Sequence, residues 1–452
     1  MKPFVRPIAF FFSALLVLCG TASCIFKRDY GDPENDGKVL FVLHVAPVST
    51  RADGGINKVT EKIRSLRVIA IGERGIELNE KKTFENAVSA QELSYFFSWY
   101  TDAGKKDFYL FANEESVQAI QFTDNQRPTG LGDHAKLGDL LNLDRYAATP
   151  GEDSSFKEVT KASGSGGTAE TRADKAAAEQ FKTVINSLFF SPDYRIENQE
   201  IYLPYSVFYG DVNLKGGSPI EKTMYLVPVA TKFTFSFQNY RTQEVEVKEI
   251  KVSPIHSQNF LLGRVAENEQ TKPFNSHPDE PEKNEMLYWV DWLAKVSEES
   301  QRYPGTSDNS DINTRYGWIS DYVIPPHEGG PSVFVSDSDE PACTIPAGKK
   351  TEEEEVASSL TIGPFYRPES RHEGTEQQYL LTLRLHDTSQ NSDKDPLFED
   401  VVIENLRSLF RTTQVIINVT LRQGNVEVYA EIAPWNEKKA NGWVIEGEAP
   451  KS

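Results

Sequence analysis

The chain has 452 residues and a formal net charge of −19 at pH 7, from 48 basic and 67 acidic side chains. Its length and its apolar fraction of 38% indicate two or three folded domains. The acidity argues against a nucleic-acid-binding surface and against an anionic membrane surface as the main partner, because both require a basic footprint. Three cysteines are too few for a disulfide scaffold.

The start of the chain has the pattern of an exported, lipid-modified protein. Two basic residues precede an apolar run at residues 8–19, which is shorter than the roughly 20 residues of a membrane span and typical of a signal-peptide core. Small residues then lead to Cys24 in the sequence GTASC, which resembles a bacterial lipobox with Thr21 in place of the usual aliphatic residue. We therefore predict a signal peptide at residues 1–23, acylation of Cys24 and a lipid-anchored precursor at the outer membrane. A plain signal peptide with an incidental cysteine is the alternative.

Residues 39–46, VLFVLHVA, predict the first strand of the folded part. Apart from His44 the run is apolar and rich in β-branched side chains, so we expect a strand that is buried on both sides. A polar stretch at residues 25–38, rich in Gly, Asp and Pro, would tether this strand to the lipid. Pro47 ends the strand, and residues 48–55 are expected to form an exposed loop.

Further along the chain, apolar residues alternate with polar ones, as in antiparallel strands with one buried face. The expected inward-facing runs are Phe233, Phe235 and Phe237; Leu381, Leu383 and Leu385; Val415, Ile417, Val419 and Leu421; and Val426, Val428, Ala430 and Ile432. Residues 422–425 between the last two runs predict a hairpin turn. A change of parity between Val247 and Ile250 predicts a β-bulge. The pattern therefore predicts a mostly β protein built from antiparallel β-sandwiches with a few short helices.

Helices, loops and a domain boundary complete the predicted organisation. Helices are expected at residues 86–100, 175–190 and 285–298, and a surface loop at residues 154–172. The polar, proline-containing stretch at residues 263–283 predicts a domain boundary. We place it between an N-terminal domain at residues 52–265 and a C-terminal domain at residues 266–452.

The sequence lacks the common catalytic and metal-binding motifs. No two of the seven histidines lie four residues apart, and HExxH, CxxC and GxSxG are absent. The glycines of residues 164–167 lack the Lys-Ser/Thr that completes a phosphate-binding loop. The sequence therefore predicts a non-enzyme that needs no cofactor and no metal. A glycosidase is kept as a third reading, because spacing alone cannot pair two carboxylates across a cleft.

Six segments in chain order carry a resemblance to a known family. They are residues 63–71 (IRSLRVIAI), 106–113 (KDFYLFAN), 203–206 (LPYS), 229–233 (VATKF), 365–370 (FYRPES) and 379–383 (YLLTL). In this order they resemble strand motifs of the Bacteroidales fimbrillin family, the lipoprotein-derived subunits of type V pili. The chain departs from the family pattern at Tyr205, where the family often has Met, and at residues 407–410, where an Arg-Asn-x-x-Tyr motif is degraded to RSLF.

The resemblance implies two sandwich domains of the transthyretin-like, Greek-key type and a route of assembly. In the family, the first strand completes the N-terminal sandwich until a trypsin-like, Arg-specific protease cuts the following loop. The matching bond here joins Arg51 to Ala52, so residues 24–51 would form a removable pro-segment. A C-terminal strand of the next subunit would fill the groove head-to-tail. The candidate donor residues are Trp443, Val444 and Ile445.

The resemblance thus predicts a structural and adhesive subunit of a cell-surface fimbria. Its expected partners are other fimbrial subunits, the protease during maturation, and a host or bacterial surface ligand. A stalk, a tip and an anchor subunit all remain open. The alternative is a glycan-binding surface lipoprotein of a polysaccharide-uptake system, which would share export, acylation and sandwiches but show exposed aromatic platforms and no processing.

Overall fold

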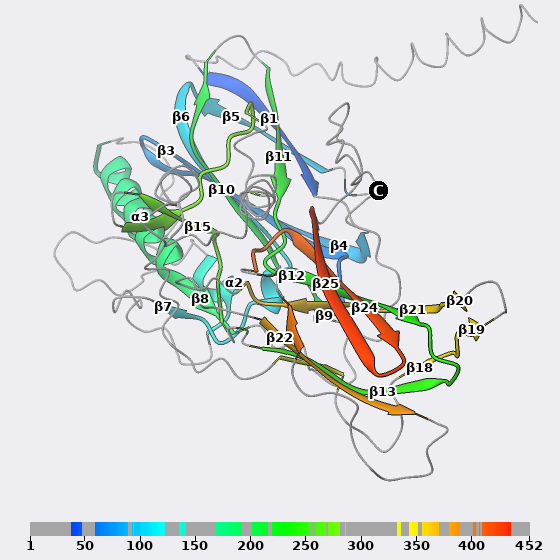
Figure 1. Ribbon diagram of the computed structural model, residues 1–452. Coiled ribbons are helices and arrows are strands. Elements are labelled where there is room, and N and C mark those ends of the chain that lie inside the picture. The colour runs from blue at the N-terminus through cyan, green and yellow to red at the C-terminus, as the bar shows by residue number, and fades with distance from the viewer. Residues whose placement is uncertain are drawn as a thin grey trace, which may run out of the picture.

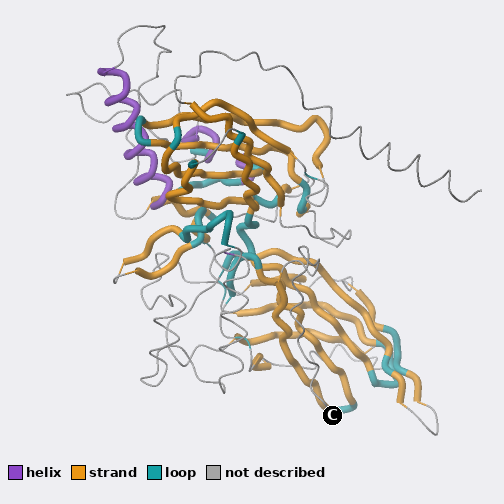
Figure 2. The backbone as a smooth tube through the Cα atoms, turned by 90° about the horizontal axis from the view of Figure 1, so that it is seen from above, coloured by secondary structure: helices purple, strands orange, loops and turns teal. Residues whose placement is uncertain are grey.

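The computed structural model describes residues 38–47, 59–88, 93, 95–122, 135–141, 168–191, 201–215, 219–253, 255, 258–267, 270–280, 285, 332–335, 343–350, 355–369, 379–387, 401–403, 406 and 409–434. Within these residues the fold is mostly β, as predicted, and the longer strands form two β-sandwiches (Figure 1). Figure 2 shows the sandwiches as two bodies of strands joined by loops, with the longer helix along one side of the first.

The N-terminal sandwich consists of a three-stranded and a four-stranded sheet around a common apolar core. The three-stranded sheet has the order β11-β1-β5, formed by β1 (Lys38–Pro47), β5 (Tyr95–Asp102) and β11 (Ile220–Leu226). The four-stranded sheet has the order β10-β6-β3-β4, formed by β3 (Ile63–Gly72), β4 (Gly75–Val88), β6 (Gly104–Ala112) and β10 (Tyr205–Leu214). Alternate apolar residues of both sheets fill the space between them, which is the arrangement expected of a sandwich.

The four-stranded sheet is covered on its second face as well. Helices α2 (Leu137–Leu141) and α3 (Thr168–Ser187) form a further apolar core with β3 and β6. In this core the rings of Tyr109 and Phe181 meet edge to face, with centroids 5.3 Å apart. Burial on both faces explains why residues 108–112 form an unbroken apolar run instead of an alternating one.

The C-terminal sandwich is built from two further sheets around their own core. One has the order β21-β12-β24-β25, formed by β12 (Thr231–Asn239), β21 (Ser358–Arg367), β24 (Thr413–Arg422) and β25 (Asn425–Pro434). The other has the order β17-β13-β22-β23, with β18 also paired to β13. Its strands are β13 (Val245–Ser253), β17 (Ser332–Val335), β18 (Cys343–Ile345), β22 (Tyr379–Asp387) and β23 (Val401–Ile403).

Short strands and one turn of 3-10 helix complete the described fold. The pairs are β2 (Val59–Thr60) with β9 (Ile201–Tyr202), β15 (Arg264–Glu267) with β16 (Gln270–Pro273), and β19 (Lys349–Lys350) with β20 (Glu355–Val356). A small sheet has the order β14-β8-β7, from β7 (Gln121–Phe122), β8 (Leu188–Phe190) and β14 (Asn259–Phe260). The 3-10 turn is η2 (Glu114–Ser116).

The predicted strand patterns are confirmed in most places. The inward runs of β12, β22 and β24 are buried, and β24 and β25 form the predicted hairpin. Gly424 in its turn has a φ of 76°, a conformation that glycine adopts without strain. The register of β13 against β22 shifts between Val247 and Glu249, which is the predicted bulge.

Two predicted helices and one predicted loop need correction. Within the predicted helix at residues 86–100, the described residues 86–88 and 95–100 are strand: β4 ends at Val88 and β5 begins at Tyr95, because the aromatic residues of β5 pair with β1 and pack on the core. Helix α3 begins at Thr168, so the end of the predicted loop at residues 154–172 is helical. The predicted helix at residues 175–190 is confirmed up to Ser187, but its last three residues form β8, which pairs with β7 and β14. Of the predicted helix at residues 285–298, only Glu285 lies among the described residues. No helix in the described ranges is long and apolar enough to cross a membrane.

The chain passes from the N-terminal to the C-terminal sandwich before the boundary that was predicted between residues 265 and 266. Strands β12 and β13 precede that point but pair with β21, β24 and β22 of the C-terminal sandwich. In the other direction, β14 returns to the N-terminal half and pairs with β8. The chain therefore enters the C-terminal sandwich near Ala230, before the polar stretch at residues 263–283 from which the boundary was predicted.

Candidate assembly site

Strand β1 is the central strand of its sheet and is hydrogen-bonded along both edges. It runs parallel to β11, with Phe41 opposite Ile220 and Pro47 opposite Leu226. It runs antiparallel to β5 on its other edge, from the pair Lys38 and Asp102 onward. Its backbone therefore completes the sheet, and β5 and β11 would each become a free edge without it.

One face of β1 belongs to the core of the N-terminal sandwich. Val39, Phe41, Leu43 and Val45 are at most 9% exposed. The Phe41 ring meets Trp99 edge to face at 4.9 Å between centroids and lies 5.4 Å from Phe108. Burial of these four side chains contributes on the order of 10 kcal/mol, at roughly 1.5–3 kcal/mol for each.

The other face of β1 is not buried, which corrects the expectation of a strand buried on both sides. Leu40 and Val42 are half-buried and His44 is exposed. The His44 Nε2 atom lies 3.9 Å from a carboxylate oxygen of Glu221 on β11. Exposed Phe96 and Tyr225 belong to the neighbouring strands, and Phe96 stands opposite His44 in the register. The outer face of β1 thus carries two half-buried apolar side chains, Leu40 and Val42, and the exposed His44.

The residues predicted for lipidation and for protease cleavage lie before and after β1 in the sequence, outside the described residues. The described chain passes from β1, which ends at Pro47, to β2, which begins at Val59. Arg51 and Ala52 fall between these two strands in the sequence, and Cys24 precedes β1. Because β1 is the last described strand before the Arg51–Ala52 bond and the first described strand of the chain, a cut there would separate it from all the other described strands.

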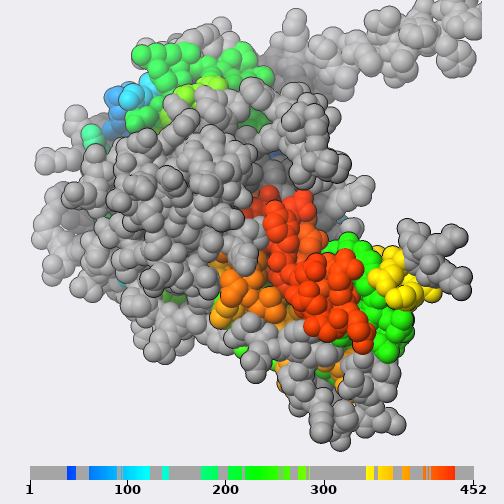
Figure 3. Space-filling model, viewed as in Figure 1, coloured from blue at the N-terminus to red at the C-terminus, as the bar shows by residue number. Residues whose placement is uncertain are grey.

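The candidate donor segment also lies outside the described residues. Trp443, Val444 and Ile445 follow β25, whose last residue is Pro434. Strand β25 is at the end of its sheet, and the hairpin of β24 and β25 lies at the surface in Figure 3, coloured red. The tail therefore continues from an edge of the C-terminal sandwich.

Buried polar residues between the sandwiches were missed as functional candidates in the sequence. The buried Glu61 carboxylate accepts a hydrogen bond from the Tyr366 hydroxyl at 2.6 Å and lies 3.0 Å from Lys232 Nζ. Arg411 and Glu369 form a second buried ion pair, with 2.7 Å between Nη2 and Oε1. Tyr366 and Glu369 both belong to the FYRPES segment, so a glutamate close to two aromatic residues was the sequence signal available for these contacts.

The described residues offer little chemistry beyond these contacts. No group of three His, Cys, Asp or Glu side chains among them is placed to hold a metal ion. Burial raises the pKa of the Cys343 thiol to about 11, so this cysteine stays protonated at neutral pH. Burial likewise raises the pKa of Tyr109 and Tyr205 above the ordinary range.

Comparison with solved structures finds similarity to fimbrial proteins and to putative cell adhesion proteins. No protein-family model matches the chain, and no curated protein does. Among solved structures, the chain is similar to the tip fimbrial protein Mfa3 of Porphyromonas gingivalis with a C-terminal truncation, at 12% identity and a TM-score of 0.38 over 88% of this chain and all of that one.

Two further similar structures have the same character. The fimbrilin FimA of Porphyromonas gingivalis is 9% identical, with a TM-score of 0.38 over 87% of this chain and 97% of that one. A fimbrial assembly protein of Parabacteroides distasonis is 7% identical, with a TM-score of 0.34 over 88% of this chain and 98% of that one. These three solved structures are fimbrial proteins.

Proposed function

We propose that this protein is a structural and adhesive subunit of a cell-surface fimbria, exported as a lipoprotein, processed after Arg51 and assembled by strand exchange. The observation that carries the proposal is the place of β1: it is the central strand of its sheet, it is the first described strand of the chain, and it supplies four buried side chains to the core. A removable strand needs this combination.

Removal of β1 would create a site for a replacement strand. The gap would expose the hydrogen-bonding groups of β5 and β11 along their facing edges, and four apolar positions in the core would lose their side chains. An exposed edge pairs readily with a strand from another chain, whose alternate side chains then set the register. Cleavage would therefore convert a closed monomer into an acceptor.

The donor proposed for this groove is the C-terminal tail of another fimbrial subunit. In an extended strand Trp443 and Ile445 point to the same side, and Val444 points to the other. Such a strand supplies large apolar side chains for two of the four inward positions of β1. The contact joins different surfaces of the two subunits, so it continues head-to-tail as a filament.

Treatment of the purified proprotein with an Arg-specific protease tests the proposal. N-terminal sequencing should find a new terminus at Ala52, and electron microscopy should then find filaments. Arg51→Ala should stay folded and monomeric under the same treatment. Arg172→Ala is the matched control, because it lies in a second Thr-Arg-Ala-Asp sequence at residues 171–174 and should behave as the wild type. Normal polymerisation of Arg51→Ala would refute processing at this bond.

The glycan-binding alternative is favoured by one observation. Phe96, Tyr225 and Tyr429 are exposed by 44%, 38% and 61%, and aromatic rings on a sheet can stack on sugars. Protease-treated protein that stays monomeric and is retained on polysaccharide, with retention lost in Phe96→Ala, would favour this alternative over the fimbrial subunit.

A further inference from the structure

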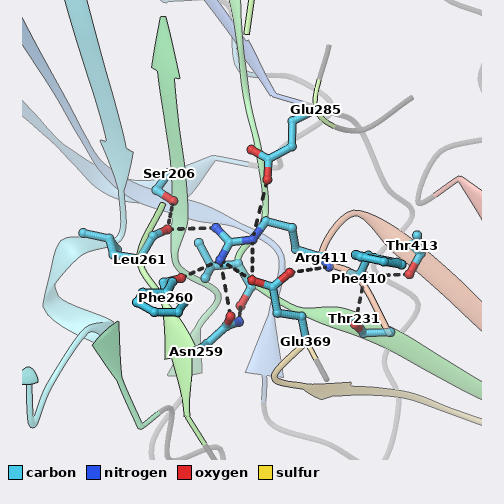
Figure 4. A network of polar contacts seen from close by, with 11 residues as sticks. Ser206, Thr231, Asn259, Phe260, Leu261, Glu285, Glu369, Phe410, Arg411 and Thr413 are labelled. Atoms are coloured by element: carbon cyan, nitrogen blue, oxygen red, sulfur yellow. Dashed lines mark hydrogen bonds and ion pairs between the residues drawn. The ribbon is translucent and has the colours of Figure 1, made fainter. Parts of the chain in front are cut away.

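Arg411 is a fully buried arginine at the junction of the two sandwiches. It follows β23 in the chain and precedes β24, and its side chain has no exposed surface. Figure 4 shows its guanidinium group surrounded by side chains and main-chain oxygens from three separate segments. We call this set, Arg411 with Glu369, Glu285 and residues 259–261, the junction clamp.

The acidic partners hold the guanidinium by charge-assisted contacts. Arg411 Nη2 donates to Glu369 Oε1 at 2.7 Å, and Nε donates to the same oxygen at 3.2 Å. The second Glu369 oxygen accepts from the Arg411 backbone N–H at 3.4 Å. Glu285 Oε1 lies 3.7 Å from Nε. Glu369 is fully buried and Glu285 is 1% exposed, so these contacts are shielded from water.

The remaining contacts reach into the N-terminal half. Arg411 Nη1 donates to the carbonyl of Leu261 at 2.8 Å, and Nη2 donates to the carbonyl of Phe260 and to Asn259 Oδ1. Residues 259–260 form β14, which pairs with β8, and Leu261 belongs to the apolar core beneath the helices. The Ser206 hydroxyl at the start of β10 also donates to the Leu261 carbonyl.

Arg411 itself is fixed to the C-terminal sandwich. Its neighbour Phe410 accepts hydrogen bonds at its carbonyl from the hydroxyls of Thr231 and Thr413, at 2.9 and 2.6 Å. Leu409 lies in the core of this sandwich, and Glu369 lies two residues after the end of β21. The Arg411 guanidinium group therefore links residues 259–261 of the N-terminal half to the segments around Glu369 and Arg411 in the C-terminal half.

A second buried contact crosses the same junction. Glu61, which precedes β3, lies 3.0 Å from Lys232 of β12 and accepts from Tyr366 of β21. The ring of Tyr366 packs in the core of the N-terminal sandwich although its strand belongs to the other one. The halves are thus joined by charged groups at two places, each with partners on both sides.

Separation of the halves would break these contacts together. A buried guanidinium is tolerated only while its donors are satisfied, because its transfer from water is costly. Linked domains usually move relative to one another unless their interface is extensive. We infer that the junction clamp couples the two sandwiches into one cooperative unfolding unit, so that neither opens from the other below the global transition. This inference does not depend on export, processing or strand exchange.

Calorimetry of the purified protein tests the coupling. The wild type should unfold in one transition with equal calorimetric and van't Hoff enthalpies, which is the criterion of a two-state process. Arg411→Met should separate this transition into two. Arg67→Met is the matched control, because Arg67 forms an ion pair with Glu114 at 2.7 Å wholly within the N-terminal half. It should lower the transition temperature without splitting the transition.

Either of two results would overturn the inference. One is a pair of resolved transitions in the wild type. The other is a single transition in Arg411→Met that is merely shifted, as in Arg67→Met. If Arg411→Met does not fold, Arg411→Lys replaces it, since lysine keeps a positive charge beside Glu369 but lacks the planar guanidinium that donates to the Leu261, Phe260 and Asn259 oxygens together; a single shifted transition in Arg411→Lys would equally overturn the coupling.

Discussion

At the residue scale, Asn113, the last residue of the KDFYLFAN motif, connects several backbone segments through its side-chain amide. It follows β6 with a φ of 54°, in the left-handed region that asparagine tolerates better than most residues. Its Oδ1 accepts from the backbone N–H groups of Arg64 and Ser65 at 2.8 and 3.4 Å. Its Nδ2 donates to the carbonyls of Lys62 and Leu203 at 2.9 and 2.7 Å. The amide thus joins the ends of strands far apart in sequence.

Asn113→Ala should lower the free energy of unfolding by about 3 kcal/mol, because buried backbone groups would lose their partners. Urea denaturation followed by circular dichroism measures this change. Asn213→Ala, at an exposed position of β10, is the control and should change stability by less than about 0.5 kcal/mol. Equal effects of the two substitutions would show that the Asn113 amide contributes nothing special.

At the scale of elements, strands with one buried face were predictable and the region before β5 was not. The alternation in β24 is a local property that can be read from Val415, Ile417 and Val419 alone. Residues 95–102 carry five aromatic or apolar side chains without such alternation, and their pairing with β1 is decided by a strand some fifty residues earlier in the chain. The predicted helix over residues 86–100 failed because this partner could not be seen locally.

The two faces of β1 should respond differently to one substitution. Leu43→Thr places a hydroxyl in the core, where Leu43 is fully buried, and should cost about 2–4 kcal/mol. Val42→Thr, one residue away on the half-buried outer face, should cost less than about 1 kcal/mol. Thermal unfolding of the uncut protein compares them. A larger loss for Val42→Thr would mean that β1 faces the core in the opposite phase.

At the scale of the whole molecule, the division into two sandwiches is set by strand pairing and is not marked by a linker sequence. Strand β12 begins at Thr231, directly after residues that pack in the N-terminal core, and it pairs with β24. Lys232 stands opposite Gln414, so the contact that places this strand lies in a distant part of the sequence. A compositional boundary cannot show such a crossing, whereas the number and type of strands are carried by local patterns.

The protein should lose stability at acidic pH, in part because Glu115 becomes protonated and its ion pair with Lys81 is lost. Burial works against ionisation of Glu115, but hydrogen bonds from Lys81 and Ser65 outweigh it, so the pKa of Glu115 is lowered. A carboxyl with a lowered folded-state pKa stabilises the protein above its unfolded pKa, near 4.5, and this stabilisation is lost as the pH falls through the folded value.

Glu115→Gln should therefore be less stable than the wild type at pH 7, by about 0.5 kcal/mol for this partly exposed pair. The difference should shrink as the pH falls below the unfolded pKa of 4.5 and vanish once it has passed the lowered folded-state pKa of Glu115. Urea unfolding of both proteins across this range measures the difference, in which the effect of the overall charge of −19 cancels. Glu80→Gln, at an exposed position on β4, should show no such trend.

The mixed pairing of β1 sets a choice of polarity for whatever strand takes its place. A replacement that runs in the direction of β1 restores one parallel and one antiparallel ladder, against β11 and β5 respectively. A replacement in the reverse direction exchanges the two ladder types between those neighbours. The two orientations bring the body of the incoming protein to opposite ends of the groove. The axial repeat of a fibre would therefore report which ladder its subunits had formed.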